Sequence, residues 1–359
     1  MFYEKRKVMN DYMTSKERVR KAIQHIQPDK VPANFECVGS VMEKLIKHYG
    51  FSDAEQVYQK LDIDIRSVGP NYIGPNLKTY YENGEKVTEN HWGWKTKHHW
   101  TGKEFNGMTT YFPLDSLETV EQLENYNWPN PDWFDYESIK YKCDKYKDKA
   151  IIMGHEGPFQ IATFLRSMDK LFMDMALEPE FAHKIYNKMV EFELEYYERI
   201  FKAADGQIDI LRPHDDYGTQ ISLLFSKGMW KDYFKDNTRK LTKLAHKYGA
   251  FYQQHSCGAV REIIPALIDC KVDVLEPIQK VKGMEPEVLK SEFGDKLTFH
   301  GGIDTQGILP FGNPEEVKKE TRRFIDTLNV NGGYILMASQ GFEGDVPIEN
   351  IEAMYSVRD

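Results

Sequence analysis

Short apolar runs alternate with longer helical patterns along most of the chain. Residues typical of β-strands gather at 31–36, 62–68, 150–154, 208–212, 250–254, 272–275, 297–300 and 334–338. Between them, helical spacing of apolar residues is found at 160–176, 180–204, 228–248, 258–270, 285–293, 314–330 and 347–357. Eight strands with crossover helices predict an α/β fold, a single (β/α)8 barrel. An open doubly wound sheet is the alternative, but no glycine-rich phosphate loop follows the first strand.

Two segments depart from this alternation. Thr14 and Glu17 have the spacing of a capping box, which predicts a helix over 14–27 before the first strand. Residues 70–115 have the composition of β-hairpins and predict a β-rich insertion after the second strand. Three tryptophans lie in this insertion, and we expect them either to cover the barrel mouth as a substrate-binding lid or to pack the insertion onto the barrel: Trp92, Trp94 and Trp100.

Composition narrows the class of protein. The 359 residues suffice for one large barrel domain over 1–359, and no run of 18 apolar residues predicts a membrane span. A net charge of −9 offers no basic face for nucleic acid. Four scattered cysteines and the lack of a signal-peptide pattern at the start predict a cytoplasmic protein without a disulfide framework.

A possible metal-binding pair lies at the end of the strand at 250–254. His255 and Cys257 are two residues apart, and side chains at that spacing on an extended segment point the same way. Imidazole nitrogen and thiolate sulfur are ligands that Zn²⁺ prefers, and a catalytic zinc site needs three protein ligands. The pair therefore predicts part of a zinc site, although a buried cysteine beside a hydrogen-bonded histidine has the same pattern.

Other polar residues follow the remaining strands. In a (β/α)8 barrel the carboxyl ends of the strands form one rim, where catalytic side chains are found. We therefore expect a catalytic centre among the following residues: Glu36, Cys37, His155, Glu156, His214, Asp215, Asp216, His255, Cys257, Glu276, His300, Asp304, Ser339 and Gln340.

Several longer motifs give the sequence a family resemblance. It resembles the uroporphyrinogen decarboxylase superfamily, and within it the branch of cobalamin-dependent methyltransferases, strongly over 150–359 and weakly over 14–70. The motifs are His255-Ser-Cys-Gly, Val272-Asp-Val-Leu-Glu-Pro-Ile-Gln279, Phe299-His-Gly-Gly-Ile-Asp304-Thr-Gln, Gly332-Gly-Tyr-Ile-Leu, Asp345-Val-Pro-Ile-Glu-Asn350, Asp215-Asp216-Tyr-Gly-Thr-Gln220 and Gly154-His-Glu-Gly-Pro-Phe159. The resemblance implies a (β/α)8 barrel, in agreement with the strand count.

The resemblance also implies a zinc site with one open question. Zinc-dependent members of the superfamily hold the metal through a His-x-Cys pair and a distant cysteine, and Gln340 stands where that cysteine is expected. Glu276 or Cys37 would complete the site, and we favour Glu276, which ends the next strand. A different signature resembles one of methyltransferases that demethylate phenyl methyl ethers, and it is matched by Glu178, Glu193 and His214. Glu178 and Glu193 bracket one predicted helix, which would hold them about 22 Å apart and so argues against a shared ion.

These observations predict a methyltransferase that removes a methyl group from a small O-methyl compound, preferably a phenyl methyl ether. The acceptor is expected to be cobalt in a corrinoid on a separate partner protein, because the chain lacks an Asp-x-His-x-x-Gly cobalamin signature. Zn²⁺ would polarise the ether and a nearby carboxyl group would protonate the leaving oxygen. The expected catalytic residues are Asp215, Asp216, Glu156 and His214; the expected substrate contacts are Trp92, Trp94, Trp100, His155 and Gln340.

Three alternatives stay open. The same fold could transfer a methyl group from a methyl-corrinoid to tetrahydrofolate or a thiol. A decarboxylase acting on a polycarboxylate tetrapyrrole is disfavoured, because the segment 34–40 after the first strand carries a glutamate and no arginine. The last alternative is a barrel that binds a ligand without catalysis.

Overall fold

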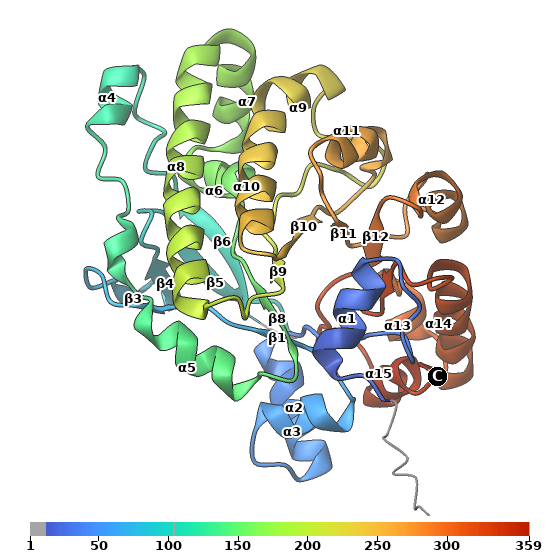
Figure 1. Cartoon of the computed structure of the whole chain (residues 1–359). Coiled ribbons are helices and arrows are strands. Elements are labelled where there is room, and N and C mark those ends of the chain that lie inside the picture. Colours follow the sequence, from blue (N-terminus) through green and yellow to red (C-terminus); the bar gives the residue numbers. More distant parts are fainter. Residues whose placement is uncertain (1–11, 103–104, 359) are drawn as a thin grey trace, which may run out of the picture.

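The computed structural model describes residues 12–102 and 105–358. Its main feature is a parallel sheet of seven strands that curls around a central axis and is surrounded by helices (Figure 1). Each strand pairs with its neighbour in the order β1 (Ile65–Ser67), β8 (Ala150–Met153), β9 (Ile210–Leu211), β10 (Phe251–His255), β11 (Val274–Glu276), β12 (Thr298–His300) and β13 (Tyr334–Ile335). These strands fall within or beside seven of the eight segments predicted from the sequence.

The eighth position is filled by an extended segment instead of a regular strand. Ala33 bridges Leu336 in parallel, and the Asn34 N–H donates to the Leu336 carbonyl at 2.9 Å. On the other side, the Asp64 N–H donates to the Ala33 carbonyl at 2.9 Å. The segment therefore links β13 to β1 and closes the ring, which confirms the (β/α)8 barrel. Pro32 has no N–H to donate, so a continuous ladder is interrupted there.

Helices cover the outside of the strands (Figure 1). The predicted helix at 160–176 is divided, because Arg166 is extended (φ −129°, ψ 129°) and the Ser167 N–H donates to Asp115 instead of a helical carbonyl. The helices are α1 (Ser15–Ile23), α2 (Gly39–Tyr49), α3 (Ala54–Lys60), α4 (Val120–Glu124), α5 (Glu137–Lys145), α6 (Pro158–Leu165), α7 (Met168–Leu177), α8 (Pro179–Ala204), α9 (Lys227–Tyr233), α10 (Lys235–Lys247), α11 (Ile264–Asp269), α12 (Pro286–Phe293), α13 (Ile308–Phe311), α14 (Pro314–Leu328) and α15 (Ile348–Tyr355), with 3₁₀ turns η1 (Pro131–Trp133) and η2 (Arg261–Ile263). Within the described residues, no helix is both long and apolar enough to span a membrane.

Helix α1 seals the amino-terminal end of the barrel. It begins at the predicted capping box, in which the Glu17 N–H donates to the Thr14 hydroxyl and the Thr14 N–H donates to Glu17. Its Val19 and Ile23 belong to an apolar cluster with six side chains from five strands: Ile65, Ala150, Ile152, Ile210, Val274 and Ile335. Ion pairs of Arg18 with Asp64 and of Arg20 with Asp209 flank this apolar cluster, and the site residues expected from the sequence lie at the opposite, carboxyl end of the strands.

The predicted insertion after the second barrel strand is a four-stranded antiparallel sheet. It consists of β3 (Thr79–Glu82), β4 (Glu85–Glu89), β5 (Lys95–Trp100) and β6 (Phe105–Tyr111), and is flanked by the pair β2 (Asn71–Tyr72) and β7 (Phe134–Asp135). Asn83 and Gly84 connect the first two strands with positive φ angles of 51° and 83°. An Asn-Gly pair adopts these angles at low cost, so the sequence itself specifies this hairpin.

Candidate functional site

Three neighbouring strands bring polar side chains together at the carboxyl end of the barrel. The register of the parallel ladder sets His255 at the end of β10 directly opposite Glu276 at the end of β11. On the other side, His214 beyond β9 forms a backbone bridge with His255. Because parallel strands end at one rim, residues more than 20 positions apart in sequence become neighbours there.

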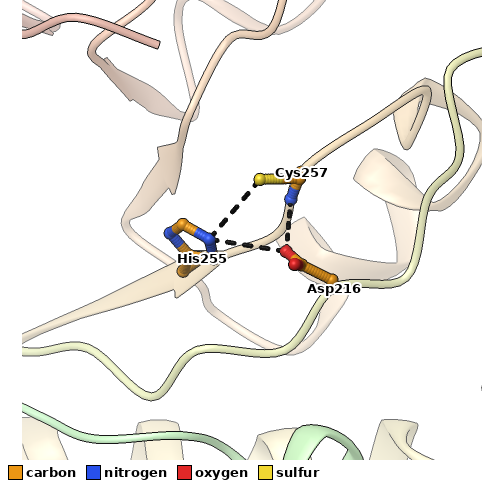
Figure 2. Close-up of side chains that lie close together, drawn as sticks. All are labelled: Asp216, His255 and Cys257. Carbon is orange, nitrogen blue, oxygen red and sulfur yellow. Dashed lines mark hydrogen bonds and ion pairs between the residues drawn. The ribbon is translucent and has the colours of Figure 1, made fainter. Parts of the chain in front are cut away.

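The centre of this site is a group of three side chains: Asp216, His255 and Cys257. They point toward one another from the loop after β9 and from the end of β10 (Figure 2). His255 Nε2 lies 3.7 Å from Cys257 Sγ and 3.4 Å from Asp216 Oδ1. The Cys257 N–H also donates to Asp216 Oδ1 at 2.8 Å, which fixes the carboxylate beside the thiol.

The turn that carries Cys257 depends on the glycine that follows it. Gly258 has a φ of +85°, and a Cβ there would lie 2.5 Å from the backbone carbon of Gly218. No other residue adopts this conformation cheaply while allowing two backbones so close. The sequence His-x-Cys-Gly therefore specifies both the donor pair and the turn that aims it at Asp216.

His255 lies at the spacing of a tetrahedral zinc site from each of its two partners, and all three donors lie within 4.8 Å of one another. With metal–ligand bonds of about 2.0–2.3 Å, tetrahedral donors lie about 3.3–3.8 Å apart. The distances of 3.4 and 3.7 Å between His255 and its two partners match this spacing. Among the described residues, this is the one group of three or more such side chains close enough to share an ion. The residues therefore fit a zinc ion with one coordination position left open.

Glu276 occupies a different place from the one expected for a ligand. Its Oε2 lies 2.8 Å from Nδ1 of His255, on the other side of the imidazole ring from Cys257 and Asp216. A carboxylate on one ring nitrogen orients the other nitrogen toward a metal and raises its basicity. The geometry thus brings Asp216, rather than Glu276, together with His255 and Cys257, and gives Glu276 a position from which it holds the ring.

Glu276 is itself held inside the barrel by a polar layer below the rim. Arg212 Nη1 lies 3.4 Å from Glu276 Oε2 and 2.6 Å from Glu36 Oε1. The Gln253 amide donates to Glu276 at 3.1 Å, and its oxygen pairs with His300 at 3.0 Å. Sequence reasoning did not select Arg212 or Gln253 as site residues. The sequence signal that could have identified them is that each is a polar residue near the carboxyl end of an otherwise apolar strand.

The charges of the group follow from burial and these partners. Burial alone lowers the pKa of His255, but the carboxylates of Glu276 and Asp216 outweigh it and raise this pKa well above the ordinary value. Burial raises the pKa of the Cys257 thiol. A metal ion would therefore replace protons on both side chains when it binds. Burial, assisted by Arg212 and His255, lowers the pKa of His214 to about 2, so that this imidazole is neutral at physiological pH.

Asp215, next to Asp216, has a separate set of partners. It is 4% exposed, accepts a hydrogen bond from the Gln160 N–H at the start of α6, and accepts another from the Tyr217 hydroxyl, both at 2.9 Å. Burial raises its pKa to about 7. These contacts tie Asp215 to the helix that follows β8, whereas the adjacent Asp216 joins the donor group.

The other predicted catalytic and binding residues surround this group. The His155 ring stacks on Tyr197 at 5.2 Å, its Nδ1 pairs with the Glu156 carbonyl, and burial lowers its pKa. The Glu156 side chain is exposed at the rim, and the His214 ring lies 4.7 Å from that of His255. The exposed Gln340 donates its amide N–H to Cys257 Sγ. The position that the resemblance assigned to a third ligand is therefore next to the donor group.

The alternative ligand sets are not assembled by the structure. Glu178 is the exposed residue before α8, while Glu193 is fully buried near the middle of that helix, and the two do not join His214 in a group able to share an ion. Cys37 lies in the extended segment of the first strand, outside the donor group, and burial raises its pKa to about 12.

The tryptophans of the insertion divide into two kinds. Trp92 and Trp94 are 2% and 7% exposed and pack against Phe192 of α8 and Phe164 of α6, at ring distances of 4.8 and 5.0 Å. Trp100 is 57% exposed on the sheet. The structure thus places two of the three where they anchor the insertion to barrel helices, which is the packing alternative of the sequence analysis.

The fold and the site together define a (β/α)8 barrel with three metal-type donors at its carboxyl mouth. Residues 109–359 match the family model described as uroporphyrinogen decarboxylase (URO-D). This chain belongs to the uroporphyrinogen decarboxylase family, which confirms the resemblance drawn from its motifs.

Individual relatives agree with this assignment. Uroporphyrinogen decarboxylases of Campylobacter jejuni, from strains 81-176 and NCTC 11168, are each 20% identical over 246 residues, or 66% of this chain and 68% of theirs. A methyltransferase from Methanosarcina mazei has a similar structure, with a TM-score of 0.66 and 18% identity over 96% of this chain and 98% of that one. At this identity the likeness shows a shared fold.

Proposed function

We propose that this protein is a zinc-dependent methyltransferase. It moves a methyl group from a small O-methyl compound, preferably a phenyl methyl ether, to the cobalt of a corrinoid carried by a separate protein. The observation that carries the proposal is the group of Asp216, His255 and Cys257, with tetrahedral donor spacing, at the mouth of a barrel whose fold is shared with a methyltransferase. When bound there, Zn²⁺ would supply a Lewis acid for an ether oxygen.

The chain's own residues would orient the metal-binding group and supply a proton. Glu276 fixes which nitrogen of His255 faces Asp216 and Cys257, and the charges of His255 and Arg212 lower the pKa of Glu276 and keep it ionised. Glu156 is exposed at the same rim and its backbone bridges His214, and we assign it to protonate a leaving alkoxide or phenolate. Asp216, expected from the sequence to act as an acid, is proposed as the third ligand.

A decarboxylase acting on a tetrapyrrole, the activity of the curated relatives, has less support. A substrate with many carboxylates needs a mouth rich in unpaired cations. Glu36, Glu156 and Asp216 lie at this mouth, and the buried Arg212 is already paired with two carboxylates. Like charges facing each other across a binding site disfavour association.

Zinc content and methyl transfer measured on the same variants test the proposal. Elemental analysis should give about one zinc per chain, and zinc-loaded protein should methylate cob(I)alamin from methoxybenzene, followed by loss of the cob(I)alamin absorbance. Cys257→Ala and Asp216→Asn should lose both zinc and transfer. Cys270→Ala removes a buried cysteine remote from the site and should lose neither.

Three results would contradict parts of this assignment. Wild-type protein that binds no zinc overturns it. An Asp216→Asn protein that keeps its zinc but loses transfer returns Asp216 to the role of an acid. Transfer seen only from methylcobalamin to tetrahydrofolate or a thiol reverses the direction of the reaction and identifies the alternative half-reaction.

A further inference from the structure

A cavity of about 480 Å³ lies on the inserted sheet, which is separate from the sheet of the barrel. Its lining comes from three strands and from the turn between the first two: Tyr81, Gly84, Glu85, Lys86, His98 and Trp100. None of these residues belongs to the donor group at the barrel mouth. A cavity of this size accommodates one small organic molecule.

The register of the inserted sheet brings the lining side chains to one face. Tyr81 pairs with Lys86, and Lys86 pairs with His98, so these three side chains lie side by side on the same face. Trp100 follows His98 by two positions on β5 and shares that face. On the other side of His98, β6 presents Gly107, which has no side chain to cover the face.

Two aromatic rings of the lining are exposed. Tyr81 is 73% exposed and Trp100 is 57% exposed. Gly84 also lines the cavity, and a Cβ built there would have no atom within 4 Å, so the turn leaves this part of the cavity empty. Large aromatic rings are mostly buried in folded proteins, and an exposed patch of them is typical of a surface that binds a ligand or a partner.

The charges around the cavity balance. Glu85 and Lys86 contribute one carboxylate and one ammonium group to the lining. Outside the lining, Lys97 contacts Glu85 at 3.1 Å and Glu82 at 3.5 Å. Two carboxylates and two ammonium groups therefore lie at this end of the sheet. Their net charge favours neither an anion nor a cation, so the ligand that fits them is uncharged.

We infer that this cavity binds an uncharged planar aromatic molecule, which lies against the rings of Tyr81 and Trp100. Contacts between aromatic rings add to the free energy gained from burial alone. Lys86 and His98 offer hydrogen bonds to a polar substituent on the ring. The site uses none of the metal donors, so it goes beyond the proposed function and does not depend on it.

Titration calorimetry of the full-length protein with two molecules of one carbon skeleton tests this assignment. 2-Naphthol is planar and uncharged at neutral pH, whereas decahydro-2-naphthol has the same skeleton without an aromatic ring. We expect 2-naphthol to bind at least about fivefold more tightly, because only its planar ring can stack. Equal affinities for the two molecules, or no binding of 2-naphthol, would overturn the assignment.

Substitutions of the two rings test where 2-naphthol binds. Tyr81→Ala and Trp100→Ala each remove one exposed ring, and each should weaken 2-naphthol about fivefold while keeping the wild-type melting temperature. Tyr141→Ala removes an exposed ring of α5 outside the cavity and should leave the affinity unchanged. An unchanged affinity in either sheet variant would overturn the placement of the ligand against both rings.

A third probe tests the class of ligand. Sugar rings also pack on exposed aromatic side chains, so methyl glucoside is titrated in the same way. If methyl glucoside binds as tightly as 2-naphthol or more tightly, the assignment of an aromatic ligand is wrong. These titrations use neither zinc nor a corrinoid, so a protein that transfers no methyl group contradicts the proposed function and leaves this binding site intact.

Discussion

The barrel mouth and the inserted sheet both contain residues predicted from the sequence to form the site. The structure brings those of the mouth together and keeps those of the sheet apart. Asp216 and Cys257 are 41 positions apart in sequence and meet through a hydrogen bond. Trp92 and Trp100 are eight positions apart, and one is buried while the other is exposed. Parallel strands that end at one rim bring distant residues together. In the insertion, Trp92 lies in the turn before β5 and packs on α8, while Trp100 lies at the far end of β5. Position at a strand end was therefore a better guide to the site than local density of aromatic residues.

The largest expected effect is a difference in stability between variants of the buried and the exposed tryptophans. Trp92→Ala removes a 2% exposed ring that packs on Phe192, and should lower the free energy of unfolding by about 3–5 kcal/mol. Trp100→Ala changes a 57% exposed residue and should stay within about 0.5 kcal/mol. Urea denaturation followed by circular dichroism measures both. Equal losses in the two variants would show that the sheet, rather than its contact with α8, depends on these rings.

A smaller effect should show how the mouth depends on residues that do not touch the metal. Glu276→Gln removes the carboxylate from Nδ1 of His255 and should weaken zinc binding about 10–100-fold, as for other residues that orient a ligand. Competition with a chelator of known affinity measures this change. Glu292→Gln alters a surface glutamate paired with Arg261 and is the matched control. If zinc is lost completely in Glu276→Gln, this residue is a ligand, as the sequence alone had suggested.

The smallest effect concerns a buried acid behind the mouth. Glu193 is fully buried, and neither of its carboxyl oxygens has a hydrogen-bond partner among the described residues. Burial, assisted by the charges of Asp215 and Glu156, raises its pKa well above the ordinary value. The folded protein therefore favours the protonated form of Glu193. Below the pKa that Glu193 has in the unfolded chain, both states are protonated and this preference leaves the free energy of unfolding unchanged. As pH rises from there toward the folded pKa, stability falls by up to about 1.4 kcal/mol per pH unit.

Glu193→Gln removes this titration and should flatten the fall. Melting temperatures measured from roughly pH 5 to 7 should decline less steeply than those of the wild type. Glu191→Gln, on the exposed side of the same helix, should follow the wild-type curve. Parallel curves for Glu193→Gln and the wild type would mean that another group dominates stability in this range.

Much of the fold could be predicted because its signals are local. Seven strands and most of the helices follow from hydrophobic periodicity, and α1 begins at its capping box. The apolar residues of the first strand also located it correctly, but they did not predict that it is irregular. Whether a segment becomes a regular strand depends on partners at Leu336 and Asp64, which no local pattern reveals.

The site was predictable only where its geometry is local. The pairing of His255 with Cys257 follows from their spacing on one strand. The approach of Asp216 depends on the conformation of the loop after β9 and on the turn at Gly258, both long-range features. Glu276 was correctly expected next to His255, but its side of the ring is set by the register between β10 and β11. Sequence spacing cannot supply that register.

The irregular first strand has a consequence for how the barrel moves. Strands β8 to β12 are joined to both neighbours by ladder pairs, but between Ala33 and Asp64, just before β1, the described hydrogen bonds are one backbone bond and one to the Asp64 carboxylate. A closed ring yields first where it is least bonded. Local opening of the barrel should therefore concentrate between the first segment and β1, beside Glu36. A ligand would then have a second route through the barrel wall, apart from the open mouth.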